Sequence, residues 1–164
     1  MTPNRRGARR DRLTRWLYRH GRPHTLARAM NRLSAAYFGS GVLAPSHWVT
    51  LEVVGRRTGR TVALPLVVAD HDGERYLVSM LGPDANWVRN VRAAGGRAVL
   101  RHGRREAVRL DEVPVTERAP VLRRYLALAP GARPHVPIDR DAPLADFDRI
   151  AHRHPVFRIG PDRP

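Results

Sequence analysis

Cysteine is absent from the 164 residues of the chain. Disulfide bonds, thiolate metal sites and cysteine nucleophiles are therefore excluded. Lysine is absent as well, so all 30 basic residues are arginine. Such a bias is typical of a GC-rich genome and lowers the weight of any single arginine. Arginine is nonetheless the better bidentate ligand for phosphate and carboxylate groups.

Long apolar runs are also missing. The basic start "MTPNRRGARRDRLTRWLYRHGRP" is not followed by an uninterrupted apolar segment. We therefore expect neither a signal peptide nor a transmembrane helix. Together with the lack of cysteine, this predicts a cytoplasmic protein.

Standard catalytic patterns are not found. The sequence has no GxSxG, no GxGxxG after a strand, no Walker loop and no HExxH. His152 and His154 form a close pair, but no carboxylate pattern of a metal site accompanies them, so a solvated helix end explains them better and no metal is expected. Asp146 and Asp148 stand two residues apart and do not share a helix face.

The positive charge is concentrated at the N-terminus. The net charge is +15, and residues 1–38 hold ten arginines and one aspartate. We expect residues 1–12 to form a basic, disordered arm and residues 13–38 a helical segment. The first helix either packs on its own domain or associates peripherally with anionic lipid at the inner face of the cell membrane. Only Trp16 and Tyr18 could stack on bases, so specific nucleic-acid binding is not expected.

From Trp48 onward the pattern is that of strands. The runs "WVTLEVVG", "TVALPLVVAD" and "RYLVSML" are joined by the turns "RRTGR" and "HDGE". Pro65 indicates an edge position or a bulge in the second strand. A hairpin around "HGRR" and a final strand "PVFRI" follow, separated by helices expected to be capped by Asp84, Thr116 and Asp141. About six mostly antiparallel strands with flanking helices predict a small barrel of the α+β class.

Two segments could carry chemistry. In the turn between the first two strands, Arg56, Arg57 and Arg60 surround Thr58-Gly59. Guanidinium groups and close backbone amides suit a phosphate or carboxylate ligand, but an ordinary arginine-rich hairpin explains the composition equally well. The second segment, "MLGPDANW", opens a helix whose N-terminus either faces an anion or polarised ring, or is merely capped with Trp87 in the core.

Read in order, the two segments give "GRRTG…PL…G…YLVSM.G…NWVRN". This pattern resembles the deazaflavin-dependent nitroreductase family, also called coenzyme F420-dependent quinone reductases, whose fold is a split β-barrel. The resemblance covers about residues 38–160. It implies a split-barrel deazaflavin-binding domain over 39–164.

The resemblance also implies site residues. Arg56, Arg57 and Thr58 would contact the phosphate and glutamate tail of the cofactor. Family members often carry a basic residue where this chain has Val62, and Arg60 would substitute for it. The remaining expected cofactor contacts fall into three segments: Val62, Ala63, Leu64, Pro65, Leu66 and Val67; Ser79, Met80, Leu81 and Gly82; and Asn86, Trp87, Val88, Arg89 and Asn90.

The implied function is an oxidoreductase that passes a hydride from the reduced deazaflavin to a small molecule: a quinone, nitro compound or activated alkene. The loop 130–143 lacks the tyrosines that could contact substrate, so Tyr125 and His135 are the candidate catalytic residues in their place. The protein would be a monomer or homodimer. The alternatives are a split barrel that binds FMN, and a non-enzymatic binder of anions or membrane surfaces that uses the arginine-rich arm.

Overall fold

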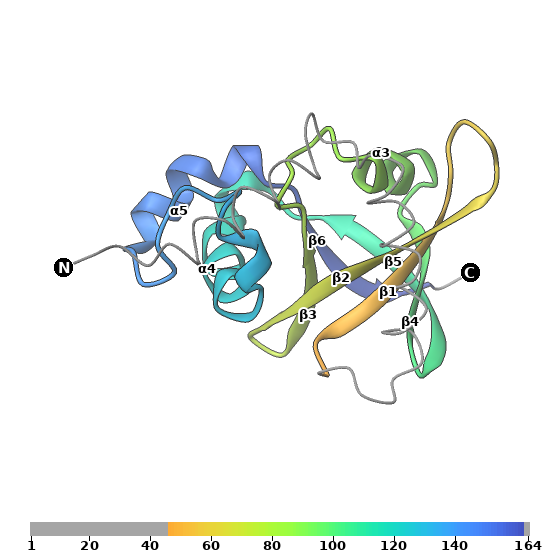
Figure 1. The fold of residues 1–164 in the computed structure, drawn as a ribbon, viewed down its shortest axis with the longest axis horizontal. Coiled ribbons are helices and arrows are strands. Elements are labelled where there is room, and N and C mark those ends of the chain that lie inside the picture. The colour runs from red at the N-terminus through yellow and green to blue at the C-terminus, as the bar shows by residue number, and fades with distance from the viewer. Residues whose placement is uncertain (1–45, 163–164) are drawn as a thin grey trace, which may run out of the picture.

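The computed structural model describes residues 46–162, so the arm and the helical segment expected within 1–38 lie outside the described residues. Six strands form a closed barrel in the order β1-β2-β3-β6-β5-β4, and each neighbouring pair is antiparallel (Figure 1). The strands are β1 Trp48–Val54, β2 Thr61–His71, β3 Glu74–Val78, β4 Arg97–His102, β5 Arg104–Glu112 and β6 Val156–Pro161. The α+β barrel predicted from the sequence is confirmed.

The barrel interior is filled by alternate residues of each strand. Val49, Leu51 and Val53 of β1 are buried in the same apolar cluster as Leu77 and Leu110. Helix α3, Asn86–Ala93, lies over one end of the barrel and adds buried side chains to this cluster (Figure 1). The alternation of β-branched and leucine side chains thus gives each strand one face in the core.

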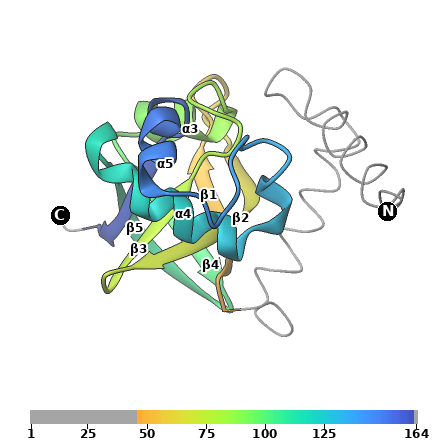
Figure 2. The same cartoon turned by 90° about the vertical axis from the view of Figure 1, so that its left-hand side faces the viewer.

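A second apolar layer lies outside the barrel. Helix α4, Arg118–Leu128, and helix α5, Leu144–Ile150, pack together beside β2 and β3 (Figure 2). Val67 and Ala69 of β2 belong to this outer cluster, because their side chains point away from the barrel interior. Three short 3₁₀ turns complete the helical part: η2 Val115–Glu117, η3 Pro130–Ala132 and η4 Ala151–Arg153.

Strand β2 pairs with β1 along its first part and with β3 along its second part, and the two ladders do not overlap. It pairs with β1 from Thr61 to Val67, whereas its ladder with β3 covers only Val68 to His71. The first half of β2 is therefore an open edge among the described residues. Pro65 lies within this edge, which confirms the edge position indicated by the sequence.

The predicted helix caps are wrong. Helices α3, α4 and α5 have Ala85, Glu117 and Pro143 at their N-caps, and none of these makes a side-chain capping bond. Asp84 pairs instead with Arg89. Thr116 lies inside the 3₁₀ turn η2, and Asp141 pairs with Arg140 in the loop before α5. Gly95 and Gly96 follow the end of α3, where both have positive φ and donate backbone hydrogen bonds to Arg92 O and Val91 O.

Candidate functional site

The arginine-rich turn between β1 and β2 has a defined backbone. Gly55 N donates to Arg60 O at 2.8 Å, and Gly59 N donates to Gly55 O at 2.8 Å. Gly59 has a φ of +65°, and a Cβ on Gly55 would lie 3.0 Å from Arg60 O. Both positions therefore favour glycine. The tight turn leaves Arg56, Arg57 and Arg60 exposed at its surface.

The structure brings the turn into contact with helix α3. Asn90 Oδ1 accepts a hydrogen bond from Arg56 Nη1 at 2.8 Å and another from Arg56 N at 3.3 Å. The Asn90 side chain is nearly buried, with the residue 5% exposed. The two sequence segments singled out for chemistry, 34 residues apart, therefore meet at one place.

The arginines of the turn form no ion pair with a carboxylate among residues 46–162. Ten arginines between residues 46 and 162 form ion pairs with carboxylates. Within that range the guanidinium groups of Arg57 and Arg60 form no hydrogen bond or ion pair, and Arg56 uses the neutral Asn90. Thr58 Oγ1 accepts a hydrogen bond from Arg60 N at 3.3 Å. Uncompensated guanidinium groups beside one another are suited to an anionic ligand.

The open edge of β2 begins directly after this turn. Val68 N donates to His47 O at 2.7 Å, on the β1 side. Because main-chain groups alternate along an antiparallel ladder, those of Ala63, Pro65 and Val67 face the edge that has no ladder neighbour among the described residues. Ala63, Leu64, Pro65 and Leu66 are half-buried, and Val62 is 40% exposed. An elongated ligand held by the turn can lie along this edge.

The segment Ser79–Gly82 is fixed by hydrogen bonds. Ser79 N donates to Pro155 O at 2.9 Å, and Ser79 Oγ donates to Gly82 O at 2.7 Å. His154 Nδ1 lies 3.1 Å from Ser79 O and carries the proton, since a carbonyl only accepts. Met80 and Leu81 stay half-exposed on this segment. Their apolar side chains are thus presented by a rigid backbone.

The residues of helix α3 that the sequence predicts to contact the cofactor fall into two groups, one buried and one at the surface. Trp87 and Val88 are buried, and Trp87 packs against Phe157 with ring centroids 5.5 Å apart. Asn86 is exposed, and Arg89 pairs with Asp84. The side chains of Trp87 and Val88 therefore hold the helix on the barrel, and Asn90 is the residue of this segment that reaches the arginine turn.

The structure places the two candidate catalytic residues in the helical part. Tyr125 is 5% exposed and belongs to the apolar cluster between α4 and the barrel. Burial raises the pKa of its hydroxyl, which weakens it as a proton donor. His135 is half-buried and follows η3, where its backbone N donates to Ala132 O at 2.9 Å. Neither residue belongs to the apolar cluster that fills the barrel beneath α3.

A buried arginine that the sequence did not suggest connects the helices. Arg118 is 6% exposed and donates from Nε to Val113 O at 2.8 Å and from Nη2 to Glu112 Oε1 at 3.1 Å. Its Nη1 reaches Ala151 O at 3.3 Å. Glu112 also accepts from Arg92 of α3, and that hydrogen bond holds the pKa of Glu112 below its usual range. Nothing in the pattern around Arg118 distinguishes it from the exposed arginines of α4.

Comparison with known proteins decides the family. Residues 26–144 match the family model for F420H(2)-dependent quinone reductase. The chain belongs to the F420H(2)-dependent quinone reductase family. It is therefore an oxidoreductase whose cofactor is coenzyme F420. No protein with a curated description matches the sequence.

Solved structures agree with the barrel. The protein Atu2129 from Agrobacterium tumefaciens has a TM-score of 0.52 at 16% identity, over 80% of this chain and 55% of that one. A candidate 5-nitroimidazole antibiotic resistance protein from Bacteroides thetaiotaomicron has a TM-score of 0.50 at 9% identity, over 80% of each chain. A third structure, the F420-H2 dependent reductase FDR-A, is 22% identical over 70% of this chain and 94% of that one, and its TM-score of 0.44 adds no support for the fold.

The residues of this family member fit the cofactor. Coenzyme F420 has an anionic tail and a planar ring, and the turn offers three arginines without carboxylate partners among residues 46–162. The open edge of β2 and the fixed segment Ser79–Gly82 offer main-chain groups and half-exposed apolar side chains for the ring.

Within residues 46–162 no helix is long and apolar enough to cross a bilayer.

Proposed function

We propose that this F420-dependent reductase transfers a hydride to a quinone, with nitro compounds and activated alkenes as further acceptors of the same class. Arg56, Arg57 and Thr58 hold the anionic tail of the cofactor in this proposal. When bound, the reduced deazaflavin supplies the hydride. A quinone that takes up this hydride and one proton becomes a hydroquinone.

One observation carries the proposal: the contact between Arg56 and Asn90. The 2.8 Å hydrogen bond fixes the Arg56 guanidinium without neutralising it, because Asn90 is uncharged. Arg56 therefore keeps donors for a phosphate or carboxylate while its position is set by a buried residue of α3. Arg57 and Arg60 add positive charge on the same turn.

The same proposal places the ring along β2. Val62 to Val67 would lie beside it, with the main-chain groups of Ala63 and Val67 available at the open edge. Met80 and Leu81 would cover an apolar part of the ring, and Asn86 and Asn90 would provide polar groups at the start and on the inner side of α3. We assign no proton transfer to Tyr125, because its hydroxyl lies in the core.

Titration of the full-length protein with coenzyme F420, followed by the cofactor's fluorescence, tests the cofactor site. We expect a dissociation constant in the micromolar range or below, as is ordinary for cofactor sites. Arg56→Ala and Arg57→Ala should each weaken binding by about tenfold, because each removes charge-assisted hydrogen bonds to the tail. Arg123→Ala is the matched control, since Arg123 is an exposed arginine of α4 without an ion pair among residues 46–162.

Turnover with reduced coenzyme F420 tests the acceptor. A water-soluble benzoquinone, a nitroaromatic and a cyclic enone are compared at equal concentration, and oxidation of the cofactor is followed by absorbance. The proposal expects the quinone to be reduced fastest. Tight cofactor binding without turnover of any of the three acceptors would contradict the substrate class and leave the cofactor site intact.

A further inference from the structure

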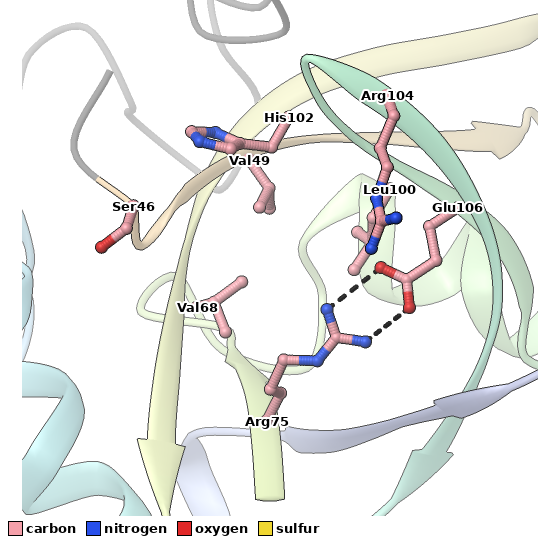
Figure 3. A pocket seen from close by; sticks show the side chains of 8 residues that line it. All are labelled: Ser46, Val49, Val68, Arg75, Leu100, His102, Arg104 and Glu106. Carbon is pink, nitrogen blue, oxygen red and sulfur yellow. Dashed lines mark hydrogen bonds and ion pairs between the residues drawn. The ribbon is translucent and has the colours of Figure 1, made fainter. Parts of the chain in front are cut away.

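A separate cavity lies at the other end of the barrel from α3. It has a volume of about 190 Å³ and is lined by Ser46, Val49, Val68, Arg75, Leu100, His102, Arg104 and Glu106 (Figure 3). These residues come from the segment before β1 and its start, from the second part of β2, from β3, and from the hairpin of β4 and β5. Strand β1 runs about 20 Å from this cavity to the arginine turn, at roughly 3.3 Å per residue. The cavity is therefore distinct from the arginine turn. It is also separate from the open edge of β2, because Val68 belongs to the cluster inside the barrel and Val67, at the end of that edge, belongs to the outer cluster.

The inner wall of the cavity is apolar. Val49, Val68 and Leu100 belong to the cluster that fills the barrel, and their side chains point into the space (Figure 3). An engineered cavity of about 150 Å³ with a wholly apolar lining is large enough for benzene. The available space thus suits a compact apolar group of about six carbon atoms.

The rim of the cavity carries one positive charge in excess. Arg75 and Glu106 neutralise each other through two hydrogen bonds of 2.6 and 3.0 Å. Arg104 forms no hydrogen bond or ion pair with residues 46–162, and its guanidinium points toward Leu100 and Glu106 above the space (Figure 3). His102 Nδ1 lies 2.8 Å from Trp48 O, so this nitrogen is already engaged as a donor.

The apolar wall, the two guanidinium groups and the one carboxylate together determine which ligand charge the cavity favours. A cation would meet two guanidinium groups, and a dianion would meet the carboxylate of Glu106 after pairing with Arg104. A neutral apolar molecule would fill the space but would form no charge-assisted hydrogen bond with Arg104, whose charge acts on Glu106 without a hydrogen bond or ion pair. A monoanion satisfies Arg104 and leaves the Arg75–Glu106 pair undisturbed.

We propose that this end of the barrel binds a small monocarboxylate, with its apolar body against Val49, Val68 and Leu100 and its carboxylate on Arg104. The site goes beyond the proposed reductase function. It shares no residue with the arginine turn or the open edge of β2.

Benzoate is the probe, because it joins a benzene ring to one carboxylate. Benzamide, which has nearly the same shape and no charge, is the control ligand. The full-length protein is titrated with each, and the methyl NMR signals of Val49, Val68 and Leu100 are followed. We expect saturating shifts with benzoate at a dissociation constant of about 1 mM or below, the range expected for a ligand of this size. Benzamide should bind at least tenfold more weakly, since it lacks the charge-assisted hydrogen bonds to Arg104.

Two variants locate the site. Arg104→Gln should weaken benzoate binding by about tenfold or more, whereas Arg97→Gln, which changes an exposed arginine at the other end of β4, should not. Val68→Phe should abolish binding by filling the space while Arg104 remains. If Val68→Phe does not fold, Arg104→Gln still decides the question, because its side chain is exposed.

The results also separate this site from the cofactor site. Arg104→Gln should leave coenzyme F420 affinity unchanged, and Arg56→Ala should leave benzoate affinity unchanged. The proposal is overturned if benzoate up to about 20 mM, well above the expected constant, shifts none of the three methyl groups. It is also overturned if benzamide binds equally well or if Arg104→Gln binds benzoate as the parent protein does.

Discussion

Asn90 accepts two hydrogen bonds from Arg56 through one side-chain oxygen. These hydrogen bonds determine whether the Arg56 guanidinium stays available to bind an anionic ligand. An uncharged acceptor orients Arg56 and leaves its positive charge for a ligand. A carboxylate in the same place would form an ion pair with Arg56 and would repel an anionic cofactor tail. The neutrality of residue 90 therefore matters as much as its hydrogen bonds.

Asn90→Asp tests this point with a change of one functional group. We expect coenzyme F420 affinity to fall by about tenfold or more, because one charge-assisted interaction is lost and a like charge is added. Ala93→Asp is the control, since it adds the same charge at an exposed position of α3. Fluorescence titration compares the two, and equal affinities would show that Arg56 does not hold the tail.

His154 gives the fold a pH dependence. Its pKa is lowered mainly by burial, with Arg153 and His152 adding electrostatic repulsion, and the Arg118 guanidinium lies near its main-chain oxygen. The unfolded chain therefore binds a proton at this residue more tightly than the folded chain does. Stability must then fall as the pH drops below the ordinary histidine value of about 6.5.

The measurement is the free energy of unfolding by urea at pH 7, 6 and 5. His154→Asn keeps a donor for Ser79 O and removes the titration, so its stability should depend less on pH in this range, by up to about 1.4 kcal/mol per pH unit. His152→Asn, at an exposed neighbour, should keep the slope of the parent protein. Asp70, Glu106 and Glu112 have lowered pKa values and contribute mainly below pH 5. Identical slopes in all three proteins would be inconsistent with a buried neutral His154.

At the scale of elements, Arg118 connects α4 by hydrogen bonds to segments that lie far from it in the sequence or in other elements. It begins α4, donates to Val113 after β5 and to Ala151 of η4, and shares Glu112 with Arg92 of α3. The two helical regions are thus linked through one buried guanidinium and one carboxylate. Arg118 also donates to His154 O, and Ser79 is hydrogen-bonded to His154 and Pro155. The Arg118 hydrogen bonds therefore also support the segment Ser79–Gly82, which we propose contacts the ring.

Removing the Arg118 guanidinium should lower the free energy of unfolding substantially. Arg118→Ala leaves Glu112 with Arg92 as its remaining donor and removes the guanidinium from the main-chain oxygens of Val113, Ala151 and His154. Because these are buried hydrogen bonds from a charged donor, we expect a loss of about 3 kcal/mol in the free energy of unfolding. Arg123→Ala, on the exposed side of the same helix, should change stability by less than about 0.5 kcal/mol. Urea unfolding measures both, and a loss below 1 kcal/mol for Arg118→Ala would mean that water replaces its bonds.

The elements differ in how far the sequence predicts them. Strands β1 and β2 follow from alternating β-branched residues around a glycine turn, and Pro65 indicates the open edge because it has no N–H to donate. The helix starts do not follow, because Asp84 and Asp141 each find a neighbouring arginine instead of a free backbone amide. Two of the site's segments could be recognised from the turn and the helix, but the Arg56–Asn90 bond depends on tertiary packing. Arg118 could not be recognised, since burial alone distinguishes it from Arg123 and Arg124.

At the scale of the whole molecule, the positive charge of the sequence is concentrated near the N-terminus. Residues 1–38 hold ten of the 30 arginines and one of the 15 acidic residues. Between residues 46 and 162, ten arginines are ion-paired, and the three arginines of the turn between β1 and β2 are among those in this range that are not. We propose that the N-terminal arginines attract the protein to an anionic membrane surface, where apolar quinones dissolve.

Deletion of residues 1–12 tests this attraction, since it removes five arginines and one aspartate. Near an anionic surface each net positive charge contributes about 1 kcal/mol, so binding to phosphatidylserine-containing vesicles should fall by at least tenfold. Binding of the full chain should also weaken steeply between low salt and physiological salt, because added ions screen the surface charge. Co-sedimentation with charged and with neutral vesicles measures both effects. The deletion should leave coenzyme F420 affinity unchanged, because the arginine turn and Asn90 remain; vesicle binding that survives the deletion would place the attraction elsewhere on the molecule.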